Sequence, residues 1–411
     1  MISIRPTLSF VQTLILTGLV FSGAGPSHAG QPSPAKPHTG HCTGPYKQKP
    51  VSAKQLRTIL GSHAQWLEER TNPAHHQADL CQADLRDSRL SGANLERAYL
   101  EGATLRHANL SHSELSQARL AGADLTIANL EGSTLSGADL RRARLSGANL
   151  TQAIGDEAAL YDADLTKARL VESSFERAHF EGATLASAVL TDGNFVDSYW
   201  YGATLAQATL TGADLMGADL RRTILTGANL EQANLQGALL DGAHMDRARL
   251  IEADLEGAYL DEASLTGATL REAILRGADL RSVHLEGATL DLADLEGANL
   301  EGARLNKARL HSSKLRMAIL YHAQLDAADF RDAQLHHAIL IAARGTRPVF
   351  SKAELTELYA PKAILRQALF NEASLESANF VAADLSGSNF THATLAQANL
   401  QEASLQDAVL I

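Results

Sequence analysis

The sequence predicts an all-β chain that winds as one long parallel β-solenoid behind a short N-terminal helix. Leucine recurs every five residues from Leu80 to Leu340 with few exceptions, and again from Leu365 to Leu410. A small residue, usually alanine, stands two positions before each leucine, and polar residues fill most other positions. Several aromatic residues of the repeats are twenty positions apart, which indicates four repeats in each turn.

A period of five fits neither an α-helix nor a straight strand. On a helix each step of five turns about 140° around the axis, so the leucines would point in every direction. On a strand an odd period would alternate them between the two faces. The chain must therefore bend once per repeat, with the small residue and the leucine pointing inward together. The polar pair after each leucine, often ending in glycine, suits the corner.

The aromatic spacing indicates how many repeats close one coil. Residues twenty apart would stack in inward columns if four repeats formed a square turn. Residues 78–411 would then make about 17 coils, and a strand spacing of about 4.8 Å gives a rod roughly 80 Å long. The candidate inward columns are Phe175 with Phe195, Phe180 with Trp200, and the series Phe330, Phe350, Phe370 and Phe390.

Two segments depart from the repeat. A leucine position holds Gly155 in TQAIGDEAAL, which predicts a bulge. Over 341–361 we expect an irregular coil or a local excursion, because Ser351 and Glu354 could cap a short helix over 352–359. The leucine frame resumes in register after this segment, so the pattern does not predict a second domain.

The first residues, 1–29, have the pattern of a secretory signal peptide. Arg5 precedes an apolar run over 8–21, and small residues end in a cleavage site at Ala29. The run is short for a bilayer span, which needs about 20 apolar residues. Cleavage after Ala29 is therefore favoured over retention as an anchor, and the protein is expected to be periplasmic or secreted, with no membrane span after cleavage.

The segment between the signal and the repeats divides in two. Residues 30–51 are rich in proline, glycine, histidine and lysine and are expected to form a flexible linker. Residues 52–77 are expected to hold a capping helix and a lead-in to the first coil. Ser52 and Gln55 fit a capping box, and apolar residues at helical spacing predict a helix over 53–69.

The chain has two cysteines, Cys42 and Cys81. Export would place them in an oxidising compartment. Cys81 follows the inward Leu80, so its side chain is expected to point outward on the first coil. A Cys42–Cys81 disulfide would tie the capping helix over the open end of the core, and two unrelated thiols are the alternative.

No motif in the sequence predicts a catalytic, cofactor-binding or metal site. The chain contains no phosphate loop, nucleophile elbow, zinc spacing or dinucleotide fingerprint. His38, His41 and Cys42 could together hold a metal ion, but a solvated linker is the simpler interpretation. His244 and His284 share a column two coils apart, which is too far for one ion.

The repeat A-(D/N)-L-x-x resembles that of the pentapeptide-repeat proteins. Residues 78–80 (ADL), 83–85 (ADL) and 93–95 (ANL) match it directly, and the match covers roughly four-fifths of the chain. The resemblance implies a right-handed quadrilateral β-helix with the central leucine or phenylalanine inside. The segment ILGSHAQWLEER also resembles the leader that precedes many such arrays.

These features predict an exported, non-enzymatic protein that acts as a rigid interaction or structural module, with an unknown protein partner in the envelope. The net charge of −11 disfavours binding to nucleic acid. Removal of the signal peptide also removes Arg5 and makes the net charge more negative. The C-terminal coil, ending at 408–411, would leave a sheet edge open, and a homodimer through this coil is possible.

Two alternatives remain. Some pentapeptide-repeat proteins resemble DNA in shape and charge and bind DNA gyrase, so the resemblance also allows an acidic inhibitor or protector of a topoisomerase. The export signal opposes this, as do outward arginines that interrupt an acidic face, namely Arg89, Arg169, Arg249 and Arg309. The second alternative is a carbohydrate-active β-helix enzyme, but such enzymes build their sites on long loops, and the repeats leave almost none.

Overall fold

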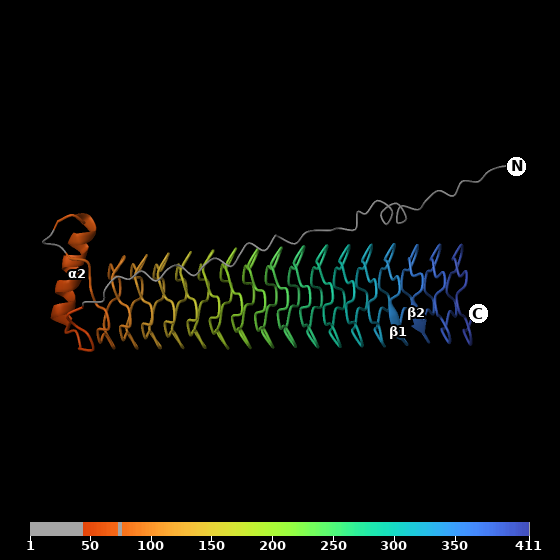
Figure 1. Ribbon diagram of the computed structural model, residues 1–411, viewed down its shortest axis with the longest axis horizontal. Coiled ribbons are helices and arrows are strands. Elements are labelled where there is room, and N and C mark those ends of the chain that lie inside the picture. The colour runs from red at the N-terminus through yellow and green to blue at the C-terminus, as the bar shows by residue number, and fades with distance from the viewer. Residues whose placement is uncertain (1–43, 73–75, 411) are drawn as a thin grey trace. The chain divides into compact units, whose positions relative to one another are not determined.

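A computed structural model describes residues 44–72 and 76–410. The expected signal peptide, Cys42 and the pair His38 and His41 lie outside these residues. The described chain forms one helix, α2 (Ala53–Glu68), and then a solenoid of stacked coils (Figure 1). Helix α2 and the coils belong to one compact unit.

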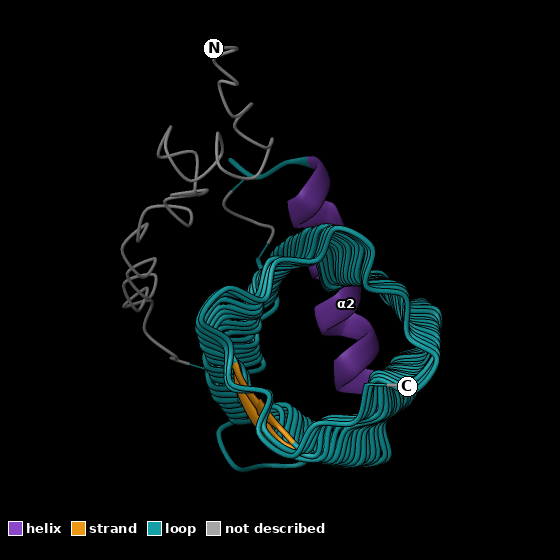
Figure 2. Cartoon of the chain, turned by 90° about the vertical axis from the view of Figure 1, so that its right-hand side faces the viewer, coloured by secondary structure: helices purple, strands orange, loops and turns teal. Residues whose placement is uncertain are grey.

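Each coil takes twenty residues, in agreement with the aromatic spacing. Parallel bridges join Asp79 to Tyr99 and Tyr99 to Arg119, and the same step continues along the chain. Two slightly longer strands, β1 (Arg344–Thr346) and β2 (Ile364–Arg366), also pair in parallel. Viewed along the axis, the coils superimpose (Figure 2). The molecule is therefore a quadrilateral parallel β-helix with four repeats per turn.

The corners are tight turns with one residue in the left-handed region. At the first corner Ala83 N–H donates to Leu80 O (3.1 Å), and Gln82 has a φ of 53°. The same turn recurs along the array, and glycine is frequent at its third position because other residues cost roughly 1 kcal/mol there. Where a larger residue occupies the position, the backbone ladder between coils holds it in place.

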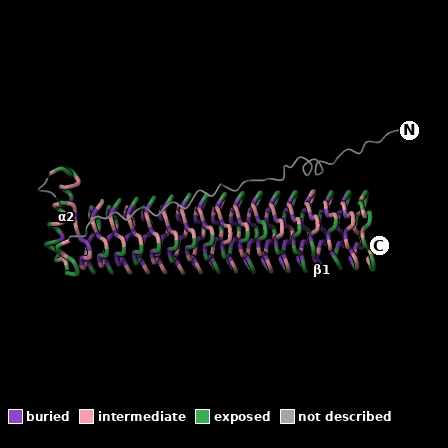
Figure 3. Tube along the Cα trace, in the orientation of Figure 1, coloured by how far each residue is buried: buried purple, intermediate pink, exposed green. Residues whose placement is uncertain are grey.

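The core is a continuous column of alanine and leucine pairs. Inward residues between Ala78 and Phe390 are nearly all buried, and outward residues alternate with them (Figure 3). Full burial of one leucine contributes about 1.5–3 kcal/mol. Because each coil contacts only its neighbours, stability accumulates along the stack.

The predicted aromatic columns lie inside the solenoid, and their rings stack between successive coils. All eight side chains are buried. Phe380 adds an edge contact to Phe370 at 6.0 Å. The centroid separations within the columns are 6.3 Å for Phe175–Phe195, 4.0 Å for Phe180–Trp200, and 5.0, 5.1 and 4.8 Å along Phe330, Phe350, Phe370 and Phe390.

Gly155 does not produce the bulge that the sequence predicts. Ile154 keeps its bridges to Thr134 and Ser174, so the coil is regular. The ring of Phe175 in the next coil takes the place of the missing side chain, since a Cβ atom added at Gly155 would lie 2.1 Å from Phe175 Cε1. The larger side chain in one coil thus compensates for the smaller one in the coil before it. The total core volume is kept, so the backbone does not need to deform.

The segment 341–361 keeps the twenty-residue register and is not an excursion, but its corner at 345–348 departs from the usual turn because Pro348 has no N–H to donate to Gly345 O. No helix forms over 352–359. Lys352 occupies a corner with a φ of 62°. Leu358 and Ala360 are both buried and exchange the usual order of small and large residue. A helix this short is marginal by itself, whereas the coils on either side offer a complete hydrogen-bonding ladder.

Helix α2 begins at the predicted capping box and covers the N-terminal end of the core. Ser52 N–H donates to Gln55 Oε1 (2.9 Å), and Gln55 N–H donates to Ser52 Oγ (3.4 Å). Leu56 is buried, and Ile59 and Leu60 pack partly buried against the core. The helix lies across the end of the solenoid (Figure 2), where it shields inward residues that have no preceding coil.

The described part of the expected linker, 44–51, is ordered against the first coil. Gln48 N–H donates to Gln82 O (2.8 Å), and Val51 N–H donates to Asp84 O (3.2 Å). These bonds satisfy backbone groups at the N-terminal edge of the sheet. Composition suggested a flexible segment because proline and glycine hide the short pairing stretch.

Cys81 lies next to the outward Glu101, with Sγ 3.0 Å from Glu101 Oε2, but only 2% of its surface is exposed. The chain at Gly44 covers it, since a Cβ atom added there would lie 3.3 Å from Cys81 O. Cys42 lies outside the described residues, so the Cys42–Cys81 disulfide stays a prediction. We expect titration of the denatured, unreduced protein to find no free thiol, and two free thiols would contradict the bridge.

His63 is expected to make the cap sensitive to acid. Its ring is fully buried, Nδ1 accepts a hydrogen bond from Ala78 N–H (3.1 Å), and Nε2 has no partner among the described residues. Burial lowers the pKa of His63, and the Glu96 carboxylate opposes that shift. The unfolded chain therefore binds the proton more tightly. The contribution to stability is complete above about pH 6.5 and declines as the pH falls toward the folded pKa.

Hydrogen exchange at the Ala78 amide tests this expectation at pH of about 7.5 and about 5. After correction for intrinsic exchange, protection is expected to be lower in acid. His63→Gln keeps an acceptor but cannot titrate in this range, so it should remove the pH dependence. Equal protection of the native chain at both pH values would contradict a role for His63.

Candidate functional site

The four sides of the solenoid differ in their outward residues. Each side presents the residue before the central leucine or phenylalanine and the two residues after it. We call the side that runs along Leu100, Leu120 and Leu140 the tyrosine face, because it carries every tyrosine of the repeats. These residues, all partly exposed, are Tyr99, Tyr161, Tyr199, Tyr201, Tyr259, Tyr321 and Tyr359.

Three rings stack along the tyrosine face. His179 lies between Tyr161 and Tyr199, with centroid separations of 5.0 and 4.6 Å and interplanar angles of 19° and 9°. His179 Nδ1 lies 3.0 Å from Glu181 Oε1. Burial raises the pKa of Tyr161 to about 12. This part of the face is therefore a stack of polar aromatic rings that spans neighbouring coils.

The arginines of the tyrosine face are bound within the face. Arg221 pairs with Asp219 at 2.6 Å and Arg281 with Asp279 at 2.7 Å, each inside one Asp-Leu-Arg repeat. Hydrogen bonds to these carboxylates raise the pKa of both arginines. Such partly exposed pairs contribute about 0–1 kcal/mol to stability, but they fix the direction of each guanidinium.

One tyrosine of the face holds a guanidinium between its ring and a carboxylate. The Arg119 guanidinium lies 4.7 Å from the centroid of Tyr99 and 3.9 Å from Glu101 Oε1. Arg222 makes a longer contact of 6.0 Å with Tyr201. Guanidinium groups favour positions within about 6 Å of an aromatic centroid. Tyrosine rings of this face therefore already bind arginine side chains of the same chain.

The carboxylates near Tyr259 are not each paired with an arginine, unlike Asp219 and Asp279. Asp241 forms no ion pair with any described residue, and the nearest arginine to Asp261 is Arg281, at 3.6 Å. That arginine is closer to Asp279, at 2.7 Å. Burial raises the pKa of both Asp241 and Asp261, and the Asp279 carboxylate raises both further. The region around Tyr259 therefore carries uncompensated negative charge.

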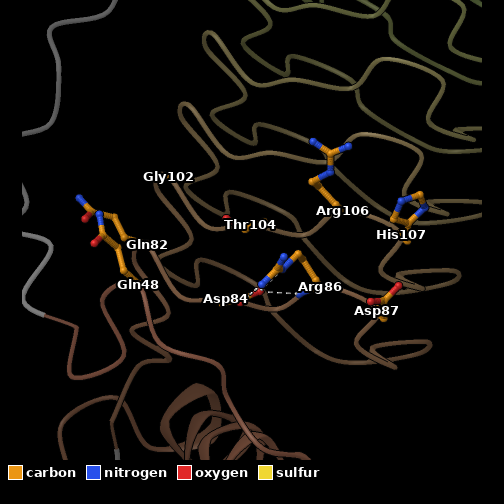
Figure 4. A pocket seen from close by; sticks show the side chains of 9 residues that line it. All are labelled: Gln48, Gln82, Asp84, Arg86, Asp87, Gly102, Thr104, Arg106 and His107. Atoms are coloured by element: carbon orange, nitrogen blue, oxygen red, sulfur yellow. Dashed lines mark hydrogen bonds and ion pairs between the residues drawn. The ribbon is translucent and has the colours of Figure 1, made fainter.

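A groove at the first coils is lined by polar side chains (Figure 4). Arg86 is bound to Asp84 at 2.7 Å, and Arg106 lies 3.7 Å from Asp124. No group of three or more histidine, cysteine, aspartate or glutamate residues within 44–72 and 76–410 could hold a metal ion. We assign no chemistry to this groove, because its two arginines are engaged by carboxylates of the first coils.

A family model for pentapeptide repeats matches the coils. The matched segments are 76–111, 113–152, 158–197, 201–237, 228–267, 263–302, 293–332, 303–340, 349–387 and 388–411. The chain belongs to the pentapeptide-repeat family. Its fold is the right-handed quadrilateral β-helix that the resemblance implied, and the family explains the repeated core and corners, although not the tyrosine face.

Solved pentapeptide-repeat structures resemble parts of the chain. HetL, involved in heterocyst differentiation regulation in the cyanobacterium Nostoc sp. strain PCC 7120, is 30% identical over 59% of this chain and 90% of its own, with a TM-score of 0.21. QnrB1, a plasmid-mediated fluoroquinolone resistance protein, is 19% identical over 49% of this chain and 91% of its own, with a TM-score of 0.30. No curated protein matches the sequence.

The tyrosine face is the feature that the period of five does not reveal. Tyrosine positions differ by multiples of twenty within two columns, one through Tyr99 and Tyr259 and one through Tyr161 and Tyr201. The sequence of this pentapeptide-repeat protein therefore contains the tyrosine columns, but they can be recognised only when its residues are arranged in coils of twenty. None of the described helices is long and apolar enough to cross a membrane.

The last described coil leaves core leucines uncovered. Leu395, Leu400 and Leu405 are partly exposed and Leu410 is 54% exposed, whereas the equivalent leucines of earlier coils are buried. Pairing with a second copy would cover this edge. We expect a dimer in sedimentation experiments at micromolar concentration, and Leu400→Asp should prevent it. Monomer alone for the unaltered chain would contradict the prediction.

Proposed function

We propose that this pentapeptide-repeat protein is exported and acts as a non-enzymatic, rigid module that binds a protein partner through the tyrosine face. The observation that carries the proposal is the gathering of all repeat tyrosines on one of four sides. Protein interfaces are enriched in tyrosine and arginine and depleted in lysine. The tyrosine face fits this composition, with several arginines and Lys362 as its one lysine.

The geometry favours binding in a second way. The stacked Tyr161, His179 and Tyr199 rings and the Asp-Leu-Arg pairs are held in fixed directions before any partner arrives. Ordering flexible side chains opposes association by about 0.5–1.5 kcal/mol for each one immobilised. A pre-ordered face avoids much of this cost, and tyrosine supplies contact area with few rotatable bonds.

The tyrosine face also has a largely apolar section toward the C-terminal coils, in which Lys362 is the one charged residue between Ile319 and Val381. Ile319, Ile339, Ile341 and Val381 are partly exposed there, together with Tyr359. Contiguous apolar residues on an otherwise polar surface are typical of contact sites. The proposed interface therefore combines an apolar section with a polar, aromatic one.

Export is supported by the signal pattern over 1–29, and its test is processing in the native host. We expect the mature chain to start at Gly30 and to fractionate with the periplasm or the medium. An unprocessed cytoplasmic chain would contradict export and make inhibition of DNA gyrase, the alternative function, the next assay. Cleavage of a glycan by the purified chain would contradict the non-enzymatic assignment.

Binding is tested by chemical cross-linking of envelope fractions followed by quantitative mass spectrometry. The double variant Tyr199→Ala, Tyr201→Ala is expected to lose the partner that the native chain retains. Thr209→Ala with Thr211→Ala is the matched control, because these residues occupy the same two positions on the opposite side of the coil. Equal loss in both variants would contradict a role for the tyrosine face.

A further inference from the structure

The Tyr99 repeat shows how the tyrosine face binds a guanidinium. In Tyr99-Leu100-Glu101 the ring and the carboxylate flank the leucine of one repeat. Arg119, one coil further on, places its guanidinium 4.7 Å from the ring centroid and 3.9 Å from the carboxylate. The three groups form an internal site for a cation, filled by the chain itself.

The Tyr259 repeat has the same two groups without the arginine. Tyr259-Leu260-Asp261 repeats the order of tyrosine, leucine and carboxylate, and the position one coil further on holds Asp279. An acidic residue therefore stands where Arg119 stands relative to Tyr99. Asp241, one coil before Asp261, adds another carboxylate and forms no ion pair with the described residues.

Among residues 44–72 and 76–410, no cationic side chain fully takes the place that Arg119 has beside Tyr99. Arg281 approaches Asp261 to 3.6 Å, but its shorter bond, 2.7 Å, is to Asp279. Asp241 accepts a hydrogen bond from Asp261 N–H (3.3 Å), which does not neutralise its charge. We call Leu239, Asp241, Tyr259 and Asp261 the Tyr259 site, a partly exposed aromatic and acidic surface.

We propose that the Tyr259 site binds an arginine or lysine side chain of the protein partner, so that the partner contacts this coil through a basic segment. The inference rests on the proposed function and adds the chemistry of the contact. Charge complementarity selects a cation, the aliphatic stem of arginine or lysine can pack on Leu239, and the Tyr99 repeat supplies the same arrangement within the molecule. Such cation–aromatic contacts contribute about 0.5–2 kcal/mol.

Fluorescence anisotropy with defined peptides tests the site directly. The probe is a fluorescein-labelled peptide of alternating arginine and serine, and the comparison peptide carries citrulline, which keeps the shape without the charge. The purified full chain is expected to bind the arginine peptide and not the citrulline peptide. Tyr259→Ala, and separately Asp241→Asn with Asp261→Asn, should each weaken binding by about tenfold.

A charge-matched variant separates the site from general attraction to an acidic rod. Asp254→Asn with Glu256→Gln removes the same charge from another side of the solenoid and is expected to leave binding within about twofold of the native value. Absence of binding by the native chain would overturn the proposal. An equal loss in this variant would overturn it too.

Photo-cross-linking in the native host distinguishes failure of the site from failure of the proposed function. Benzoylphenylalanine replaces Tyr259 in one strain and Thr269, on another side, in a second strain. A cross-link from position 259 to an arginine- or lysine-containing peptide of a partner supports the proposal. A cross-link from position 269 alone overturns the Tyr259 site but leaves a protein-binding role intact, and no cross-link from either position overturns both.

Discussion

Gly155→Leu, which restores the residue that the repeat pattern favours, is expected to destabilise the solenoid by about 1–3 kcal/mol. A Cβ atom at this position would lie 2.1 and 2.5 Å from two ring atoms of Phe175, and a leucine side chain would extend further into the same space. Gly155 is not in the left-handed region, so the penalty is one of volume and not of backbone strain. Thermal unfolding followed by circular dichroism measures it.

The double variant Gly155→Leu, Phe175→Leu supplies the control. It places leucine at both positions, as at Leu135 and Leu215 of the same column, so most of the lost stability should return. Recovery would show a coupling between two residues twenty positions apart in the chain. If the single variant were as stable as the native chain, the ring of Phe175 would not fill the space at Gly155 as described.

Trp200→Ala is expected to be more costly still, at about 3–5 kcal/mol. The Trp200 ring is fully buried, stacks on Phe180 at 4.0 Å and meets Phe195 edge to face at 5.5 Å. Its Nε1–H also donates to Ser198 Oγ (2.6 Å). Removal of the ring would leave a cavity and break an aromatic stack that spans neighbouring coils.

The loss should be local, because each coil depends mainly on its neighbours. Hydrogen exchange is therefore expected to increase most in the coils that contain Phe180 and Trp200, with distant coils little changed. Tyr201→Ala, which truncates an outward ring next to Trp200, is the matched control and should cost less than about 1 kcal/mol. Uniform loss of protection along the whole array would show that the solenoid unfolds as one unit.

The repeat made most of the fold predictable. A core residue that returns every five positions leaves few ways to gather leucines on one side of a backbone, and the phenylalanine and tryptophan spacing gave the coil length. The capping box at Ser52 and Gln55 likewise predicted the first turn of α2. These signals are local or strictly periodic, so they can be recognised without knowing which residues are in contact.

Other features depend on contacts between coils and could not be predicted. The ring of Phe175 fills the space beside Gly155. The repeat pattern around Gly155 alone does not show this contact and predicts a bulge. Ser351 and Glu354 predict a short helix over 352–359, but the adjacent coils give that segment backbone hydrogen-bond partners that keep it in the solenoid. Residues around Gly44 cover Cys81; the repeat itself does not indicate this contact, although the predicted Cys42–Cys81 disulfide would bring the same segment to the first coil.

The coil length also determines which genetic changes the molecule can accept. Duplication or loss of twenty codons would change the rod by one coil of about 4.8 Å and leave every outward column in line. A change of five codons would keep the core pattern but rotate all later residues by a quarter of the circumference. Tyr99 and Tyr259 would then lie on different sides, so selection on a flat interface would retain whole-coil changes and remove the others.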